Sequence, residues 1–382
     1  MTVYVPVRPE MLIWARKRSQ KDRSSLLTSF PALAAWEQGT KRPTLKQLEQ
    51  FAQATHAPIG YFFLSEPPEE PLPIPDFRTI GNEEISRPSP DLLETIYQCQ
   101  QRQEWYRSYA QSQRESSVPF VGTLTLNSDV KESAIRMHEV LEFGFDQRGN
   151  TFDEALRRLV EQAEKNGVLV MRSGIVGSNT HRKLNPDEFR GFALADDLAP
   201  LIFVNGTDTK PAQIFTLVHE LAHIWIRESA ISNTDMESMP NNSIELWCNK
   251  VAAEFLVPGS ALRGYELNQD DLVNELGRLA RRFKVSTLVI LRRLFDANYF
   301  TEKQYWEHFF VERERIKRLM AEHRSDGGNF YNTLPVRASQ RFTRALIKST
   351  LEGETLYRDA LRMLGFKKIS DFNKMAEELK VI

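Results

Sequence analysis

An apolar segment with three ionisable residues, FTLVHELAHIWI at residues 215–226, constrains the fold of this chain more than any other feature. Apolar side chains occupy nearly every position, so a helix here has no face suited to solvent and must be buried. Glu220 would then be buried without compensation unless a charge of opposite sign lies beside it. The segment therefore predicts a buried helix with a cation next to it.

Two histidines in this segment are spaced for metal binding. His219 and His223 lie four residues apart and share one face of a helix, so both can direct a ring nitrogen at one ion. This is the HExxH pattern, in which two histidines hold zinc and the glutamate accepts a proton from water at the ion. The alternative is a pair of core histidines satisfied by neighbouring carbonyls. Because the surroundings are apolar throughout, zinc is the favoured interpretation.

A catalytic zinc site needs a third protein ligand and one open position. Glu245 is the best candidate because it opens a second apolar helix, IELWCNKVAAEFLVP, and Glu254 on that helix is the reserve. Asn249 follows Glu245 by one turn, where its amide oxygen could accept the other ring N–H of a zinc histidine. Alternatively, Glu245 is a first-turn glutamate favoured by the helix dipole. Three further acids are less suitable because of their helix or loop positions: Glu228, Asp235 and Glu237.

These roles predict hydrolysis of a peptide bond, with Glu220 moving the proton from water to the leaving amine. The strand expected at residues 200–206, directly before the histidine helix, could take an extended substrate as an added strand. A second donor for the oxyanion is not fixed by the sequence. Three residues are candidates: His181, Tyr265 and Tyr331.

Length and composition set the class of protein. The chain has 382 residues, enough for more than one domain, and its net charge of -1 excludes a globally basic nucleic-acid coat. Its two cysteines, Cys99 and Cys248, form no disulfide or CxxC pattern, which fits a reducing compartment. The start lacks a signal-peptide pattern, and no apolar run is long enough to cross a membrane. We therefore expect a cytoplasmic protein.

A proline-rich stretch marks the clearest domain boundary. Five prolines lie between Pro67 and Pro75 among acidic residues, a composition typical of an extended linker. The sequence thus divides into four parts: an N-terminal domain at 1–64, the linker at 65–76, a peptidase-like domain at 77–260 and a helical C-terminal extension at 261–382.

Periodicity places the expected elements. Helical patterns cover residues 91–115 and 153–167, and strand patterns follow at 168–174, 188–196 and 200–206. Thr207 or Thr209 can cap the histidine helix, which should run to about Arg227. Past Pro258 the pattern is wholly helical. The predicted fold class is α+β, a small sheet with the HExxH helix, between an all-α N-terminal domain and a helical extension.

These motifs resemble those of a known family. HELAHIW, the later ExxxN and AAEFLVP, and the FVNG strand before the helix are similar to the ImmA/IrrE zinc metallopeptidases, from about Phe77 onwards. LARRFKVS and GGNFYNT resemble segments of the family's long members. The resemblance implies zinc held by His219, His223 and Glu245, a ligand set of gluzincin type, with Glu220 catalytic. It also implies a protein substrate, a partner transcriptional repressor. Thermolysin-like peptidases usually have Asp where this chain has Asn249.

The first 64 residues resemble an Xre-type helix-turn-helix domain with five helices. Nine Lys and Arg against four Asp and Glu give it a basic footprint. Its expected recognition helix starts with apolar residues from Phe30 to Ala35, so phosphate contacts without much base discrimination, or docking of a protein, are the two interpretations. The candidate nucleic-acid contacts are Arg16, Lys17, Arg18, Lys41 and Arg42.

A second helix-turn-helix spacing occurs at residues 276–300, with basic residues around it. A helical bundle with a solvated basic face is the favoured interpretation. The sequence as a whole predicts a zinc endopeptidase that cleaves a regulatory protein. Its rivals are a DNA-binding regulator whose zinc is structural or whose site is silent, and a toxin that partners an antitoxin.

Overall fold

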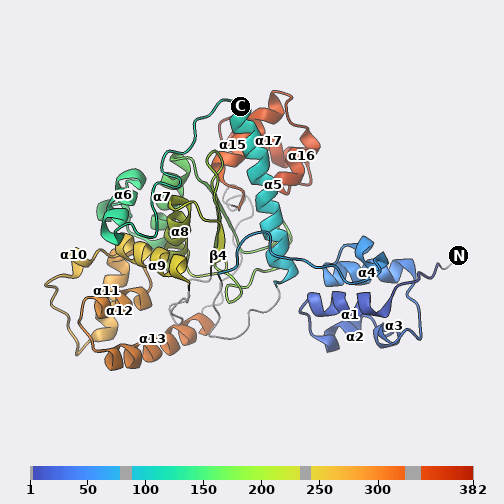
Figure 1. Cartoon of the computed structure of the whole chain (residues 1–382), viewed down its shortest axis with the longest axis horizontal. Helices are drawn as coiled ribbons and strands as arrows, with labels where there is room; N and C mark the ends of the chain where they lie inside the picture. Colours follow the sequence, from blue (N-terminus) through green and yellow to red (C-terminus); the bar gives the residue numbers. More distant parts are fainter. Residues whose placement is uncertain (1–2, 78–87, 233–241, 323–336, 382) are drawn as a thin grey trace. The chain divides into compact units, whose positions relative to one another are not determined.

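The computed structural model describes residues 3–77, 88–232, 242–322 and 337–381. The chain divides into two compact units, Met1–Pro73 with Ile85–Ile96, and Ile74–Glu84 with Tyr97–Ile382 (Figure 1). We take each unit by itself.

The N-terminal unit is built from short helices, as predicted. Its elements within Met1–Pro73 are α1 (Pro9–Arg18), α2 (Arg23–Ser29), α3 (Leu33–Glu37), α4 (Leu45–Thr55) and a 3₁₀ helix, η1 (Ile59–Phe63). Asp22 accepts a hydrogen bond from the Ser25 amide to begin α2, and Thr44 forms a capping box with Gln47 to begin α4. Trp36, Phe51 and Phe62 are buried in a small core of this unit.

The second unit contains a four-stranded mixed sheet. Its strands are β1 (Leu169–Ser173), β2 (Gly191–Leu194), β3 (Leu201–Asn205) and β4 (Ala230–Ser232), in the order β1-β3-β2-β4. β1 runs parallel to β3, and β2 runs antiparallel to both β3 and β4. The α+β class and the first three strands agree with the predictions. β4 was not expected. It has only three residues, which are too few to show the alternation of apolar and polar side chains that distinguishes a strand from a loop.

The strand order overturns one prediction. β3 lies between β1 and β2, and its backbone is paired on both sides. An extended substrate therefore has no free edge on residues 200–206, because a strand inside a sheet has no unpaired N–H and C=O groups to offer. The edge next to the histidine helix is β4 instead.

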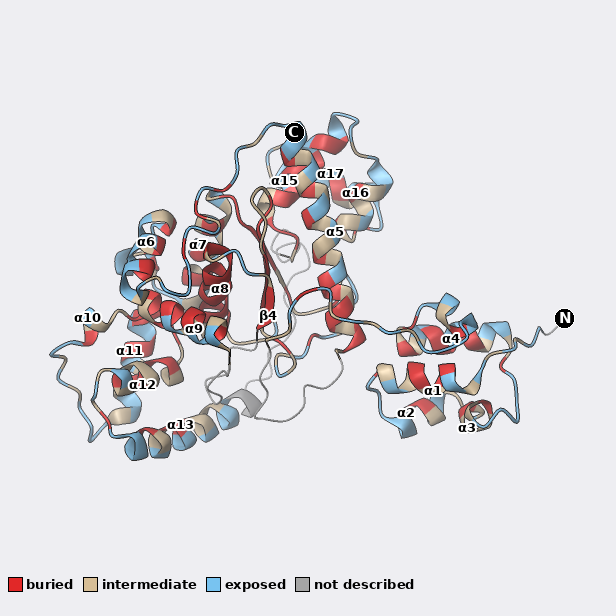
Figure 2. Cartoon of the chain, in the orientation of Figure 1, coloured by how far each residue is buried: buried red, intermediate tan, exposed pale blue. Residues whose placement is uncertain are grey.

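The histidine helix is α8 (Lys210–Trp225), and it packs against β2 and β3. The Thr209 side chain caps it by accepting a hydrogen bond from the Ala212 amide. All thirteen residues from Gln213 to Trp225 are buried, and Figure 2 shows the buried colour along most of this helix. The expectation of a helix without a solvent face is confirmed.

Further helices enclose α8. α7 (Phe152–Lys165) and α9 (Ser243–Leu256) contact it directly, and α6 (Val130–Leu141), which the sequence patterns did not predict, packs on α9. Figure 1 shows α6 to α9 on one side of the sheet and α15 (Gln340–Leu351) on the other. From this other side, the Gln103 side chain of α5 (Pro90–Ser112) donates to the carbonyls of Leu194 and Ala199. The sheet is thereby covered on both faces.

The core does not stop at the expected boundary near residue 260. α10 (Gly259–Leu262), α11 (Leu272–Phe283) and α12 (Thr287–Asp296) bury Leu262, Phe283 and Ile290, respectively, in the core that also holds α8 and α9. The apolar positions of residues 276–300 are thus used for packing, which favours the helical-bundle interpretation of that stretch. The remaining described helices are α13 (Glu302–Glu322), α16 (Tyr357–Leu364), α17 (Ile369–Glu378) and a second 3₁₀ helix, η2 (Phe145–Gln147).

Arg148 ties this shared core together. Its guanidinium is fully buried and donates to the carbonyls of Leu256 and Phe283, which end α9 and α11, and to that of Phe255.

Among the described helices, none is both long and apolar enough to span a membrane.

Candidate metal centre

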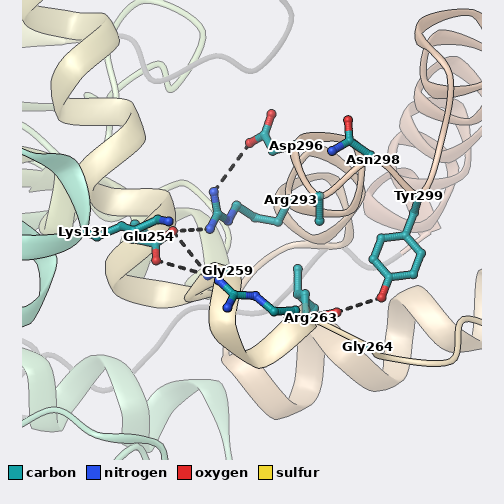
Figure 3. A pocket seen from close by; sticks show the side chains of 11 residues that line it. Lys131, Glu254, Gly259, Arg263, Gly264, Arg293, Asp296, Asn298 and Tyr299 are labelled. Carbon is teal, nitrogen blue, oxygen red and sulfur yellow. Dashed lines mark hydrogen bonds and ion pairs between the residues drawn. The ribbon is translucent and has the colours of Figure 1, made fainter.

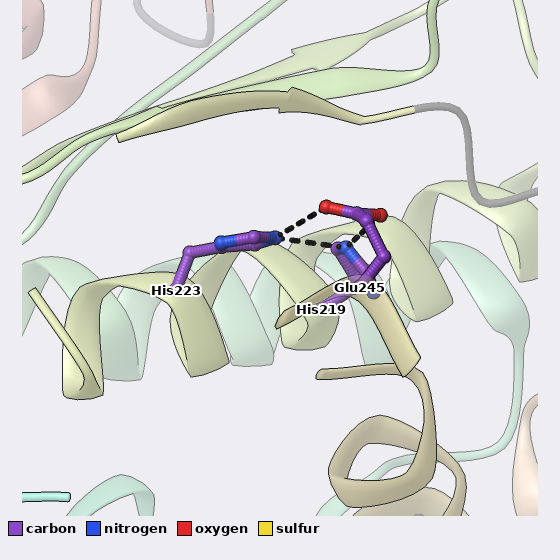
Figure 4. Close-up of side chains that lie close together, drawn as sticks. All are labelled: His219, His223 and Glu245. Atoms are coloured by element: carbon purple, nitrogen blue, oxygen red, sulfur yellow. Dashed lines mark hydrogen bonds and ion pairs between the residues drawn. The ribbon is translucent and has the colours of Figure 1, made fainter. Parts of the chain in front are cut away.

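Two neighbouring helices bring three ligand-type side chains to one point. α8 supplies His219 and His223 from the same face, and Glu245 reaches them from the first turn of α9. The side chain of Asn242 caps α9 by accepting a hydrogen bond from the Ile244 amide, which fixes where the helix begins. Figure 4 shows the three side chains pointing toward one another.

The distances within this cluster are short. Nε2 of His223 lies 3.1 Å from Nε2 of His219 and 3.0 Å from Oε1 of Glu245, and Nε2 of His219 lies 3.2 Å from Oε2 of Glu245. Ligand atoms bound to one zinc ion with tetrahedral geometry lie about 3.3 Å apart. The cluster therefore has the spacing and the donor atoms to hold one metal ion, and all three side chains are buried.

The protonation states also fit metal ligands. Burial lowers the pKa of the His223 imidazole, which favours the neutral ring that a metal requires. Burial acts to raise the pKa of Glu245, but the charge of His219 and hydrogen bonds from His219 and His223 outweigh it and hold that pKa below its usual range. The pKa shifts of His223 and Glu245 thus favour a neutral imidazole and an ionised carboxylate, the forms that bind a metal ion.

Glu220 lies beside the cluster and is completely buried. Neither of its carboxylate oxygens makes a regular hydrogen bond within the described part of the chain. Burial and then the charge of Glu245 raise the pKa of the Glu220 carboxyl well above its usual value, and the Ser232 hydroxyl offsets this only in part. A buried acid left this way is costly unless a cation compensates it. This orphaned carboxyl is the strongest sign that the residues suit a metal ion.

Two residues at the site were missed by the sequence analysis. Ser232, at the end of β4, is fully buried, and its Oγ lies 3.4 Å from Nε2 of His223 and 3.3 Å from Oε1 of Glu245. Gly191 on β2 pairs with Ser232 and faces Glu220: a Cβ added there would lie 3.0 Å from Oε1 of Glu220 and 2.6 Å from Cγ2 of Thr216. Only the pairing of distant strands brings either residue here, so no local pattern could identify them.

The structure does not bring Asn249 to the histidines. The Nδ1 atoms of His219 and His223 are buried, and neither has a hydrogen-bond partner among the described residues. Asn249 is partly exposed on α9 and makes no hydrogen bond with either ring. Helical spacing places Asn249 one turn from Glu245, but it does not determine whether the Asn249 side chain comes within hydrogen-bond distance of the histidines on α8.

The other acidic candidates are engaged or distant from this role. Glu254 is ion-paired with Arg293 and accepts the Gly259 amide at 3.1 Å, on the wall of a separate cavity of about 410 Å³ (Figure 3). Glu228 is exposed beyond the end of α8. Asp235 and Glu237 lie outside the described residues. Glu245 is therefore the acid that joins the two histidines within the described chain.

The candidate oxyanion donors gain no support from their positions. The Tyr265 hydroxyl is hydrogen-bonded to Glu275 on α11, and His181 lies exposed in a turn between β1 and β2. Neither contacts the three ligand residues in the described part of the chain. Tyr331, like the GGNFYNT segment, falls outside the described residues.

Comparison with protein families agrees with this geometry. Residues 163–295 match the IrrE N-terminal-like domain of peptidase family M78. The matched region runs from the end of α7 to α12, so it contains the whole sheet and the four residues His219, Glu220, His223 and Glu245. It also crosses residue 260, as the shared core does. The site therefore lies in a peptidase-type domain.

A second match covers residues 338–378 and is described as a domain of unknown function, DUF8813. It contains α15, α16 and α17. No match to a curated protein was found. The helix-turn-helix resemblance of residues 1–64 stays a prediction.

The candidate nucleic-acid contacts fall into two groups. Arg16 is ion-paired with Glu37, and Arg18 with Glu70, so both guanidinium groups are held inside the N-terminal unit. Lys17, Lys41 and Arg42 are exposed. α3 has only five residues and buries Leu33 and Trp36, which leaves little surface for reading bases. The exposed group is the one suited to phosphate contacts.

Proposed function

We propose that this chain is a zinc-dependent endopeptidase of gluzincin type. The observation that carries the proposal is the buried triad of His219, His223 and Glu245, within 3.2 Å of one another. Beside it lies the buried carboxyl of Glu220, which makes no regular hydrogen bond within the described part of the chain. The peptidase-family match of the surrounding domain supports it.

The mechanism assigns a task to each residue. His219, His223 and Glu245 would hold the ion, which when bound supplies Lewis acidity toward water and toward a peptide carbonyl. Glu220 accepts the proton of the attacking water and passes it to the leaving amine as the C–N bond breaks. Burial raises the pKa of Glu220, so a cation held by the three neighbouring residues would be needed to keep this carboxylate ionised before the first transfer.

We propose a regulatory protein as the substrate, in particular a transcriptional repressor or an antitoxin-like partner. This part rests on the resemblance to ImmA/IrrE peptidases. The buried free cysteines Cys99 and Cys248 suit a reducing compartment, and we place the protein in the cytoplasm. The competing function is a DNA-binding regulator, or a toxin–antitoxin component, whose metal site is structural or silent.

Metal content of the purified full chain tests the site. We expect about one zinc per chain in the wild type and a loss in both His223→Ala and Glu245→Gln. His181→Ala and Glu228→Gln are matched controls, because both residues are exposed and should leave the zinc content unchanged. A wild type that binds no zinc when it is supplied would make the regulator the better interpretation.

Glu220→Gln separates catalysis from a structural metal. This variant should retain zinc and lose cleavage of co-expressed regulators by at least 100-fold, because only the proton acceptor has been removed. Zinc retained with unchanged cleavage would contradict the proposed role of Glu220.

DNA contact through the N-terminal unit remains a proposal. Lys41→Ala and Arg42→Ala in the full chain should weaken DNA binding and reduce its dependence on salt, because each removes one phosphate contact. Arg157→Ala, an exposed arginine of α7, is the control. DNA binding that is absent or equal in all variants would favour docking of a protein by this unit.

A further inference from the structure

The outer edge of β4 is occupied by a segment of the same chain. The Ile231 amide donates to the carbonyl of Pro75 at 3.0 Å, and the Phe77 amide donates to the carbonyl of Ile231 at 3.0 Å. These two bonds make Asp76 and Ile231 a parallel bridge pair. The end of the proline-rich stretch therefore pairs with the outer edge of β4 through a single bridge.

β4 presents this edge because of its pairing with β2. Ala230 and Ser232 face β2, where the carbonyl of Ser232 accepts the Arg190 amide at 3.3 Å, so the N–H and C=O of Ile231 point the other way. Unpaired backbone groups at an edge are a template for an extended peptide. Residues 75–77 fill that template.

This edge borders the candidate metal centre. Ser232, the residue after Ile231, has its hydroxyl within 3.4 Å of both His223 and Glu245. The ring of Phe77 lies 6.4 Å from the ring of His223, centroid to centroid, with an angle of 28° between the ring planes. Ile74 is buried at the start of the segment, with 8% of its surface exposed. The segment thus lies along the strand and next to one of the histidines.

We propose that residues 74–77 close the substrate edge of the peptidase from within the same chain, with Phe77 beside His223. The inference rests on the proposed function, because it assigns the β4 edge to an extended substrate peptide. A substrate must displace these residues to form backbone bonds with Ile231. The peptide class that fits is an extended segment with an apolar side chain next to His223.

The closure is suited to regulation. A tethered segment competes at an effective concentration of the order of millimolar, so a free peptide must bind well or the segment must be withdrawn. The prolines that precede it cannot form a helix and favour an extended chain, which keeps the segment in a strand-like conformation.

Phe77→Pro in the full chain tests the closure. Proline removes the amide that donates to Ile231 and also the aromatic ring, while it keeps the preceding residue extended. Leu72→Pro adds the same residue elsewhere in the proline-rich stretch and is the matched control. Two readouts apply: hydrogen exchange of the Ile231 amide, and binding of the capped peptide Leu-Pro-Ile-Pro-Asp-Phe, which copies residues 72–77.

We expect the Ile231 amide of Phe77→Pro to exchange at least 10-fold faster than in the wild type and in Leu72→Pro. The peptide should bind Phe77→Pro at least 10-fold more tightly than the wild type. Equal exchange rates or equal peptide affinities would overturn the closure. If Phe77→Pro does not fold, Phe77→Ala keeps both backbone bonds and removes only the ring; it should bind the peptide more tightly than the wild type, and equal affinity would again overturn the proposal.

The two proposals fail in different ways. Hydrogen exchange and peptide binding are measured on zinc-free and zinc-loaded protein and need no cleavage. Suppose that the protein holds zinc and that its cleavage activity depends on Glu220, but that the Ile231 amide exchanges equally in all variants. The peptidase proposal would then stand and the proposed closure would be wrong. If the protein never binds zinc, the proposed peptidase function fails. The assignment of the β4 edge to a substrate then fails with it.

Discussion

The hydroxyl oxygen of Ser232 lies 3.3 Å from Oε1 of Glu245, so β4 contacts α9, the helix that carries the acidic member of the candidate metal centre. The same hydroxyl is 3.4 Å from Nε2 of His223 on α8. One small side chain thus connects β4, α8 and α9 at the candidate metal centre. A residue that supports ligands in this way tunes metal affinity without being a ligand itself.

We expect Ser232→Ala to weaken zinc binding by about 10- to 100-fold without abolishing it, the range typical of residues that orient metal ligands. Zinc affinity measured by competition with a chelator checks this. Ser243→Ala is the control, because Ser243 is exposed on α9 and should leave the affinity unchanged. An affinity equal to that of the wild type would mean that Ser232 only fills space.

Gly191 and Gly277 should respond to alanine with opposite signs. A Cβ at Gly191 would lie 2.9 Å from the carbonyl of Phe203 and 3.0 Å from Oε1 of Glu220, so we expect a loss of about 1–3 kcal/mol in unfolding free energy. Gly277 lies inside α11, and its Cβ would meet only the Arg281 guanidinium at 3.6 Å. Gly277→Ala should raise the unfolding free energy by about 0.5–1 kcal/mol. Urea denaturation of both variants gives the sign of each change in unfolding free energy. A Gly191→Ala variant more stable than the wild type would contradict the predicted clash of its Cβ with Phe203 and Glu220.

The parts of the site set by local geometry were predictable from the sequence. Helical spacing alone places His219 and His223 on one face, and the apolar residues around them require burial of Glu220. Glu245 could be selected because it opens the next apolar helix. The strand, helix and cap patterns around α8 follow the same local rules, and Thr209 does cap it.

The parts set by long-range pairing were not. Ser232 and Gly191 meet at the site only through the register of β2 with β4, and the sequence offers no signal for that register. The interior position of β3 likewise depends on the order of strands, so the sequence could not show that residues 200–206 lack a free edge for an extended peptide. Asn249 shows the limit of helical spacing, since a shared face does not ensure a hydrogen bond to a neighbouring helix.

Arg148→Met should destabilise the second unit by about 3–5 kcal/mol, because it leaves the buried carbonyls of Leu256 and Phe283 without their donor. Burial lowers the pKa of Arg148 to about 10, so this side chain remains charged at neutral pH. Arg157→Met, at an exposed position of α7, is the matched control and should cost little. Thermal and urea unfolding of both variants check this, and equal stabilities would show that α9 and α11 do not depend on this side chain.

Glu164 should make stability depend on pH near neutrality. Its Oε1 accepts the Gln340 amide at 3.0 Å at the start of α15, and burial raises the pKa of its carboxyl to about 7. The folded state therefore holds this proton more tightly than the unfolded state does. The resulting stabilisation is complete below the ordinary pKa of a glutamate and is lost as pH rises through about 7.

We expect the unfolding free energy of the wild type to fall between pH 5 and pH 8 by up to about 3 kcal/mol more than that of Glu164→Gln, since each pKa unit corresponds to about 1.4 kcal/mol. Glutamine keeps an acceptor for the Gln340 amide but cannot ionise, so the two proteins should converge at low pH. Urea denaturation at pH 5, 6, 7 and 8 gives the difference, in which the titration of all other groups cancels. Glu161→Gln, an exposed glutamate one turn earlier on α7, should follow the wild type. Parallel pH curves for the wild type and Glu164→Gln would show that Glu164 ionises as freely in the folded chain as in the unfolded one.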